Sequence, residues 1–212
     1  NDDETYVKPE VTYTLTGADE YYVYPRDVFA SSSNDLQASL AEGVSVVNLN
    51  NGEYQLTNSL GNAQTEISLI GNGIENTIVK GATSSNTSHP GVYAHGKDLV
   101  FKDLTYVTPN NGYQGGFGHA ASVTFINCKI IGQYYAHSEA PHTFTNCVID
   151  PLTGYLYTYG SDCEFEGCTF ESSEGKALQV YEDASNGENT VSIKNCTFKA
   201  AKQATTYDGK PV

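Results

Sequence analysis

Tyrosine and histidine recur every 18 to 24 residues from Tyr93 onward in this 212-residue chain, and they are the side chains best suited to chemistry. Five four-residue segments align, with a ring or an amide at the second position and a ring at the fourth. The second positions hold Tyr93, Phe117, Tyr135, Tyr157 and Gln179, and the fourth hold His95, His119, His137, Tyr159 and Tyr181. Sugars stack on aromatic rings, and such rings also anchor protein interfaces. The pattern therefore predicts a surface that binds a glycan or a host surface protein.

Proton transfer is the reaction that these side chains could support. In a polysaccharide lyase built on them, His119 or His137 would act as the base and Tyr157 or Tyr159 as the acid. Hydrolysis of a glycoside normally needs two carboxyl groups about 5 to 9.5 Å apart. None of the ten positions is Asp or Glu. We therefore favour a non-catalytic binding or adhesion module, and keep a lyase or glycoside hydrolase as the alternative.

Metal and nucleotide sites are weaker interpretations of this sequence. Three histidines in one column could bind a divalent metal, but no residue in the sequence is placed to approach the metal from a further direction. A Gly-x-Gly pair begins at Gly71, but a strand-like run follows where a dinucleotide-binding loop needs a helix. We expect no resident metal or cofactor, and calcium binding stays open.

Five segments that follow the aromatic positions share one template: a strand, a polar bend and a second strand. Its third position holds Phe101, Phe125, Phe144, Phe165 and Ile193, its fifth holds Asp103, Asn127, Asn146, Gly167 and Asn195, and its sixth holds Leu104, Cys128, Cys147, Cys168 and Cys196. No helix-length segment separates the repeats. This pattern predicts a solenoid whose coils stack as parallel strands.

Four cysteines share one template position, so they should form an inward column with neighbours about 4.8 Å apart. Buried thiols behave as small apolar groups, and a straight column does not offer zinc a tetrahedron. We therefore expect these cysteines to pack the core. Cys163 could pair with Cys168 across one coil. His142 stands at an otherwise apolar position and is expected to be buried.

With these repeats, the chain resembles the right-handed parallel β-helix superfamily, the pectate-lyase-like fold. The likeness rests on the coils over residues 99–199, on Asn127 and Asn146 where that superfamily has an asparagine ladder, and on a helix-like segment. That segment, residues 34–43, starts with an Asn or Asp cap, ends at Gly43, and is similar to the helix that closes the family's N-terminal end.

The resemblance implies an all-β, right-handed parallel β-helix with a short N-terminal capping helix. It also implies that carbohydrate-active members place their clefts on the strand face predicted here. Residues 1–33 are expected to form an N-terminal strand extension, with strands near 11–15 and 21–24. Residues 34–212 are expected to form the β-helix domain, truncated at its C-terminal end, where an open coil would expose strand edges.

Charge narrows the range of partners. The chain has 25 acidic and 11 basic side chains, a net charge of −14, and Arg26 is its only arginine. Binding to nucleic acid, to anionic membranes or to a polyuronate is therefore disfavoured. No apolar run approaches the ~18 residues of a membrane span.

Methionine is absent and tyrosine is abundant, which suits a bacterial extracellular or cell-surface protein. A structural spacer is the further alternative, and the oligomeric state stays open.

Overall fold

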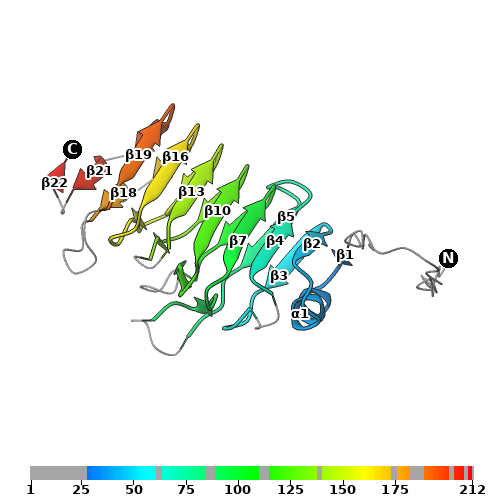
Figure 1. Ribbon diagram of the computed structural model, residues 1–212. Coiled ribbons are helices and arrows are strands. Elements are labelled where there is room, and N and C mark those ends of the chain that lie inside the picture. Colours follow the sequence, from blue (N-terminus) through cyan, green and yellow to red (C-terminus); the bar gives the residue numbers. More distant parts are fainter. Residues whose placement is uncertain are drawn as a thin grey trace, which may run out of the picture.

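The computed structural model describes residues 28–60, 64–84, 89–109, 115–137, 140–172, 176–181, 189–200, 203–207 and 210–211. Their strands stack along one axis as a right-handed parallel β-helix (Figure 1). This confirms the predicted all-β solenoid. No described helix is long and apolar enough to cross a membrane.

Two long parallel sheets form most of the coil walls. The eight-stranded sheet contains β1 (Val28–Ala30), β2 (Val46–Leu49), β4 (Glu66–Ile70), β7 (Asp98–Lys102), β10 (Ser122–Ile126), β13 (His142–Thr145), β16 (Cys163–Glu166) and β19 (Val191–Lys194). The seven-stranded sheet contains β3 (Gly52–Gln55), β5 (Thr77–Lys80), β8 (Thr105–Val107), β11 (Lys129–Ile131), β14 (Val148–Asp150), β17 (Thr169–Ser172) and β20 (Thr197–Ala200).

Two shorter sheets carry the aromatic segments. One pairs β6 (Val92–Tyr93) with β9 (Phe117–Gly118), and the other contains β12 (Tyr134–Tyr135), β15 (Leu156–Tyr157), β18 (Lys176–Val180), β21 (Gln203–Tyr207) and β22 (Lys210–Pro211). Every described pairing is parallel except β21 with β22.

The interior is built from template positions that recur in each coil. The phenylalanines at the third position stack ring on ring, with centres 4.9 Å apart for Phe101 and Phe125 and 4.9 Å apart for Phe144 and Phe165. Because side chains alternate across a strand, the residues on either side of each phenylalanine in its strand face outward. The repeat therefore builds one continuous apolar column.

The bend of each repeat has a left-handed backbone. Asp103, Asn127, Asn146, Gly167 and Asn195 have φ values of 54°, 52°, 54°, 65° and 54°. Asn and Gly tolerate this region better than most residues. The Asn127 side-chain amide donates to Asp103 Oδ1 of the preceding coil at 3.0 Å. The polar bends of these two coils are therefore joined, with Asp103 as the partner of Asn127.

The cysteines form the predicted inward column. The Sγ atoms of Cys128 and Cys147 donate to the main-chain carbonyls of Phe101 and Phe125 at 3.3 and 3.4 Å. All five cysteines are free thiols, including Cys163. Burial raises the pKa of the Cys128 thiol to about 12, so it stays protonated near neutral pH.

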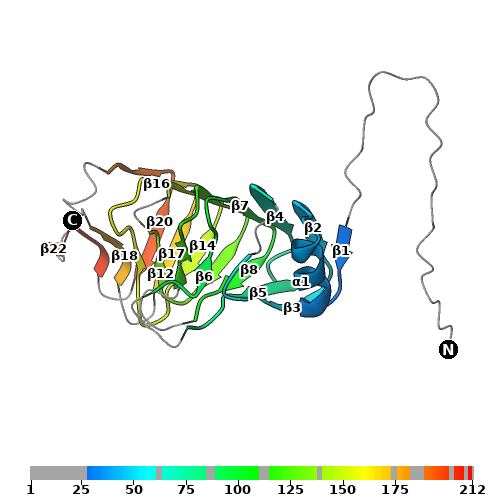
Figure 2. The ribbon, with the colours of Figure 1, turned by 60° about the horizontal axis from the view of Figure 1, so that its bottom comes forward.

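A single described helix, α1 (Ser33–Ala41), closes the N-terminal end (Figure 2). Leu36 and Leu40 are buried beneath it. The predicted Asn or Asp cap is wrong, because the Ser32 hydroxyl accepts from the Asp35 N–H at 3.2 Å and the cap therefore lies two residues before Asn34. Gly43, with φ +82°, follows its end as predicted.

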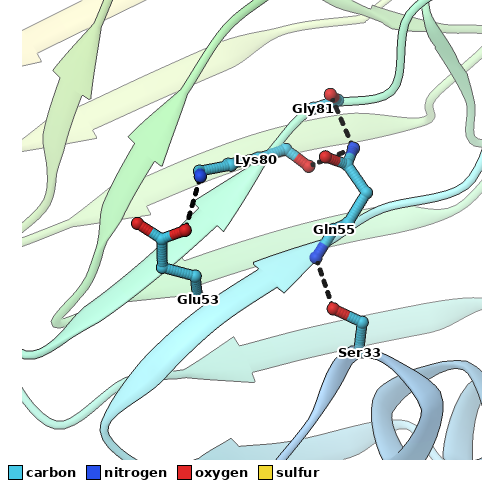
Figure 3. Close-up of polar contacts among 5 residues, drawn as sticks. All are labelled: Ser33, Glu53, Gln55, Lys80 and Gly81. Carbon is cyan, nitrogen blue, oxygen red and sulfur yellow. Dashed lines mark hydrogen bonds and ion pairs between the residues drawn. The ribbon is translucent and has the colours of Figure 1, made fainter.

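Gln55 ties this cap to the first coils (Figure 3). Its N–H donates to Ser33 Oγ of α1 at 2.9 Å. Its side-chain amide donates to the Lys80 and Gly81 carbonyls at 3.2 and 2.9 Å, beside an ion pair between Lys80 and Glu53. One glutamine thereby joins the helix to two successive coils.

The N-terminal part of the chain is described only from Val28. The strands predicted near 11–15 and 21–24 lie outside the described residues. Strand β1 pairs in parallel with β2. The first strand of the eight-stranded sheet therefore lies within the segment expected to be an N-terminal extension.

Candidate functional site

Three tyrosines stand on the outer face around β15. Leu156 and Thr158 are buried, while Tyr155, Tyr157 and Tyr159, which alternate with them, are partly exposed. Strict alternation along a strand places these three rings on one face. In the next coil, Tyr181 directly follows β18 and is also partly exposed. We call Tyr155, Tyr157, Tyr159 and Tyr181 the tyrosine patch.

Tyr157 lies at the centre of this patch. Its ring centre is 5.5 Å from that of Tyr155, 5.6 Å from that of Tyr159 and 5.4 Å from that of Tyr181. The rings of Tyr159 and Tyr181 are nearly parallel, with an interplanar angle of 5° and centres 5.7 Å apart. Tyr157 pairs with Gln179, so the register predicted for these two coils is correct. The patch is therefore one contiguous cluster spanning two coils.

Tyr135 and His137 lie beside the patch on the preceding coil. Tyr135 pairs with Tyr157 in register, and its ring meets the Tyr157 ring edge-on at 5.0 Å. Only 7% of Tyr135 is exposed, and Gln133 donates to its hydroxyl at 2.8 Å. The His137 ring is 6.0 Å from Tyr159. Tyr135 therefore packs against the edge of Tyr157. The sequence predicted an exposed ring at Tyr135, but this ring is almost completely buried.

The prediction that Phe117 faces outward is wrong. Phe117 pairs with Val92, and Gly118 pairs with Tyr93, one residue away from the register expected from the sequence. Phe117 is 0% exposed and packs against Phe101 at 5.2 Å. It is the only large apolar residue of its segment, so its burial decides the register, and a one-residue shift exchanges the faces.

Gly118 then occupies the outer position opposite Tyr93. A Cβ atom at Gly118 would lie 2.9 Å from Pro90 Cγ and 3.2 Å from Tyr93 Cδ1. A side chain at this position would clash with Pro90 and crowd the Tyr93 ring, which lies beside His119. The one-residue shift is therefore consistent with the glycines that flank Phe117.

A second aromatic group forms around Tyr93. Its ring centre is 5.9 Å from that of His95 and 5.7 Å from that of His119, with interplanar angles of 24° and 21°. Both histidines are exposed and have left-handed backbones, with φ of 48° and 55°. We call these three residues the Tyr93 group.

The tyrosine patch and the Tyr93 group belong to separate sheets. Where their sheets meet, a Cβ at Gly116 would lie only 2.2 Å from the Tyr135 carbonyl oxygen, and the described strands β9 and β12 do not pair. The structure therefore replaces the continuous ladder of five coils with two clusters.

This division separates the residues proposed for a lyase. His119 lies in the Tyr93 group, whereas Tyr157 lies in the tyrosine patch. His137 and Tyr159 are the predicted base and acid that the structure brings together. Among the described residues, no group of three or more His, Cys, Asp or Glu side chains could hold a metal ion.

Tyr155 was missed by the sequence analysis. The alignment covered four residues in each coil and stopped at Leu156. The alternation continues one step further back, because Tyr155 stands two residues before Tyr157. Lys176 Nζ lies 5.9 Å from the centre of the Tyr155 ring, a cation–π contact at the edge of the patch.

Comparison with known proteins supports the fold. A family model described as a right handed beta helix region matches residues 45–210. A search of curated proteins and a search of solved structures gave no match.

Proposed function

Because this chain belongs to the right-handed β-helix family, which suggests a carbohydrate-related or surface protein, we propose that it is an extracellular module that binds a neutral glycan without catalysis. The tyrosine patch is the observation that carries this proposal. Its four partly exposed rings form a single cluster around Tyr157.

The spacing of the patch suits a chain of sugars better than a single one. The ring centres lie 5.5 Å apart for Tyr155 and Tyr157 and 5.6 Å apart for Tyr157 and Tyr159, so the three rings extend over at most about 11 Å. Tyr181 widens the surface by one coil. Tyrosine combines an apolar ring face with a hydroxyl that forms hydrogen bonds, and both match a sugar ring.

Charge favours a neutral glycan over an acidic one. The net charge is −14, and the described part of the chain contains no arginine, because Arg26 is the only one. Bidentate recognition of carboxylates is mainly the work of arginine, and a strongly negative protein repels a polyanion.

The residues of the patch give little support to glycoside hydrolysis. They are phenols next to the amide of Gln179, and none of these side chains is a carboxyl group. A pair of carboxyl groups is the usual requirement for hydrolysis. Binding is therefore the activity that these side chains support best.

The test is glycan binding by the whole chain, measured by calorimetry on ligands selected from a glycan array. We expect Tyr157→Ala to weaken binding by about tenfold, since a buried aromatic contact contributes on the order of 1 kcal/mol or more. Tyr93→Ala is the matched control, because Tyr93 is a partly exposed tyrosine in the other cluster. Binding only to a protein ligand, or equal losses for both variants, would contradict the proposal.

A lyase is the second candidate, and the proximity of His137 and Tyr159 is the observation that favours it. Incubation with a polysaccharide panel, with added calcium, followed by absorbance of unsaturated uronate products, tests it. Turnover that disappears in His137→Ala would replace the binding module with an enzyme. A chain that neither binds nor turns over any glycan would favour the spacer.

A further inference from the structure

Two polar rings lie inside the β-helix at positions that neighbouring coils fill with other side chains. His142 of β13 pairs in register with Val123 on one side and Cys163 on the other. Tyr134 of β12, in the preceding coil, pairs with Leu156. Both rings are buried, and their centres lie 5.8 Å apart with an interplanar angle of 75°. We call Tyr134 and His142 the interior pair.

One nitrogen of the His142 ring already has its hydrogen bond. Its Nδ1 lies 2.9 Å from the carbonyl oxygen of Ala140 and 3.2 Å from Ser161 Oγ. A carbonyl oxygen only accepts, so Nδ1 carries the proton of the neutral ring. The other nitrogen, Nε2, is therefore an acceptor.

Two atoms of the interior pair have no hydrogen-bond partner among the described residues: the Tyr134 hydroxyl and His142 Nε2. Nearly all buried polar atoms of folded proteins have a partner, either a protein group or an ordered water. Here one atom is a donor and the other is an acceptor, and they do not bond to each other. A molecule that bonds to both must accept one hydrogen bond and donate another.

The surroundings of the interior pair favour a small neutral molecule. The Tyr134 ring meets the buried rings of Phe125 and Phe144 edge-on, with centres 5.7 and 5.9 Å apart. An ion bound here would lose its hydration, and the neutral pair offers it no opposite charge. Water is the smallest molecule that both accepts and donates hydrogen bonds.

We propose that a water molecule is bound inside the β-helix between the interior pair, where it accepts from the Tyr134 hydroxyl and donates to His142 Nε2. The water joins the coil of β12 to the coil of β13 and completes the hydrogen bonding of both side chains. The site is separate from the tyrosine patch, because both of its residues are buried.

Chemical denaturation of the full chain and of Tyr134→Phe tests the proposal, because this substitution removes only the hydroxyl. Loss of a hydrogen bond to a bound water should raise the equilibrium constant of unfolding by about fivefold. A hydroxyl without a partner would give the opposite sign, since its removal relieves an unpaired buried group. An unchanged or more stable Tyr134→Phe protein would therefore overturn the proposal.

Tyr106→Phe is the matched control. Tyr106 is also buried, and its hydroxyl has no partner among the described residues. That hydroxyl lies beside Gly81 of the preceding coil, and the ring contacts of Tyr106 are to Phe and Tyr rings, not to an imidazole. The control should therefore keep or gain stability. Equal losses in Tyr106→Phe and Tyr134→Phe would contradict a site at His142.

Magnetic relaxation dispersion of the solvent counts the water molecules that stay inside the folded chain. The wild type and Tyr106→Phe should hold one more such water than Tyr134→Phe, and circular dichroism checks that the variants fold. In a His142→Leu background, Tyr134→Phe should no longer cost stability, because the shared water is already lost. Equal water counts in the wild type and Tyr134→Phe, or additive effects of the two substitutions, would overturn the proposal.

Discussion

His142 is a histidine buried in the core. It lies in β13, is 1% exposed, and its Nδ1 is 2.9 Å from the Ala140 carbonyl oxygen and 3.2 Å from Ser161 Oγ. Nδ1–H donates to that carbonyl, so Nε2 carries no proton in the neutral ring, and it has no hydrogen-bond partner among the described residues. Burial lowers the pKa of His142 to about 4, and His137 adds a smaller effect in the same direction.

This environment predicts a loss of stability in acid. The ordinary pKa of histidine is about 6.5, and a lowered folded-state pKa means that the unfolded chain binds the proton first. The contribution is fully present above pH ~6.5 and is lost as the pH falls toward 4, by about 3 kcal/mol in all. Urea unfolding at a series of pH values measures this loss.

The control is His142→Leu, which places an apolar residue where the template holds Leu99 in another coil. This variant should lose less stability than the wild type between pH 6.5 and 4. Equal acid sensitivity of the two proteins would assign the effect to other groups.

At the scale of elements, α1 covers the N-terminal end of the apolar core and excludes water from it. Besides the contact between Gln55 and Ser33, three hydrogen bonds hold it: Gln37 donates to the Gln55 carbonyl at 3.1 Å, Thr57 donates to Gln37 Oε1 at 3.1 Å, and Gln64 donates to the Leu40 carbonyl at 3.3 Å. These polar contacts set the position of the helix. Its burial of Leu36 and Leu40 supplies most of the free energy.

We expect Leu36→Ala to lower the free energy of unfolding by about 2 to 5 kcal/mol, because it leaves a cavity at a fully buried site. Gln37→Ala on the same helix removes only partly exposed hydrogen bonds and should cost about 1 kcal/mol. Chemical denaturation of both variants measures the difference. Similar losses for the two would mean that α1 is held by its polar contacts.

At the scale of the whole molecule, stacking of coils brings like charges together. Glu66 and Asp98 are neighbours in register on β4 and β7, and both are exposed. The ion pairs Glu53–Lys80 and Glu171–Lys199 join neighbouring coils but are also exposed, and such pairs stabilise little. With a net charge of −14, the acidic side chains of neighbouring coils therefore repel one another weakly.

Salt should therefore stabilise this protein. We expect the melting temperature to rise by a few degrees from low salt to ~0.15 M, where the Debye length falls to about 8 Å. Glu66→Gln should raise the melting temperature at low salt and reduce its dependence on salt. A melting temperature that falls on adding salt would show that the ion pairs outweigh the repulsion.

The repeat in the sequence determined the fold, the inward cysteine column and the left-handed bends at Asn127 and Asn146. These features follow from the side-chain period of a strand and from residue types that tolerate one backbone conformation. Both are local properties, repeated in every coil, so a single chain displays them several times. The register of the coils that carry Tyr157 and Gln179 was predictable for the same reason.

Only the tertiary structure decided how the aromatic residues are grouped. It buried Phe117, covered Tyr135 and separated the Tyr93 group from the tyrosine patch. Each outcome depends on how one coil contacts the next, where an interior Phe competes with glycines for the register and a close backbone approach interrupts a sheet. These contacts join residues of different coils, far apart in the chain. They cannot be predicted from the spacing of residues within one coil.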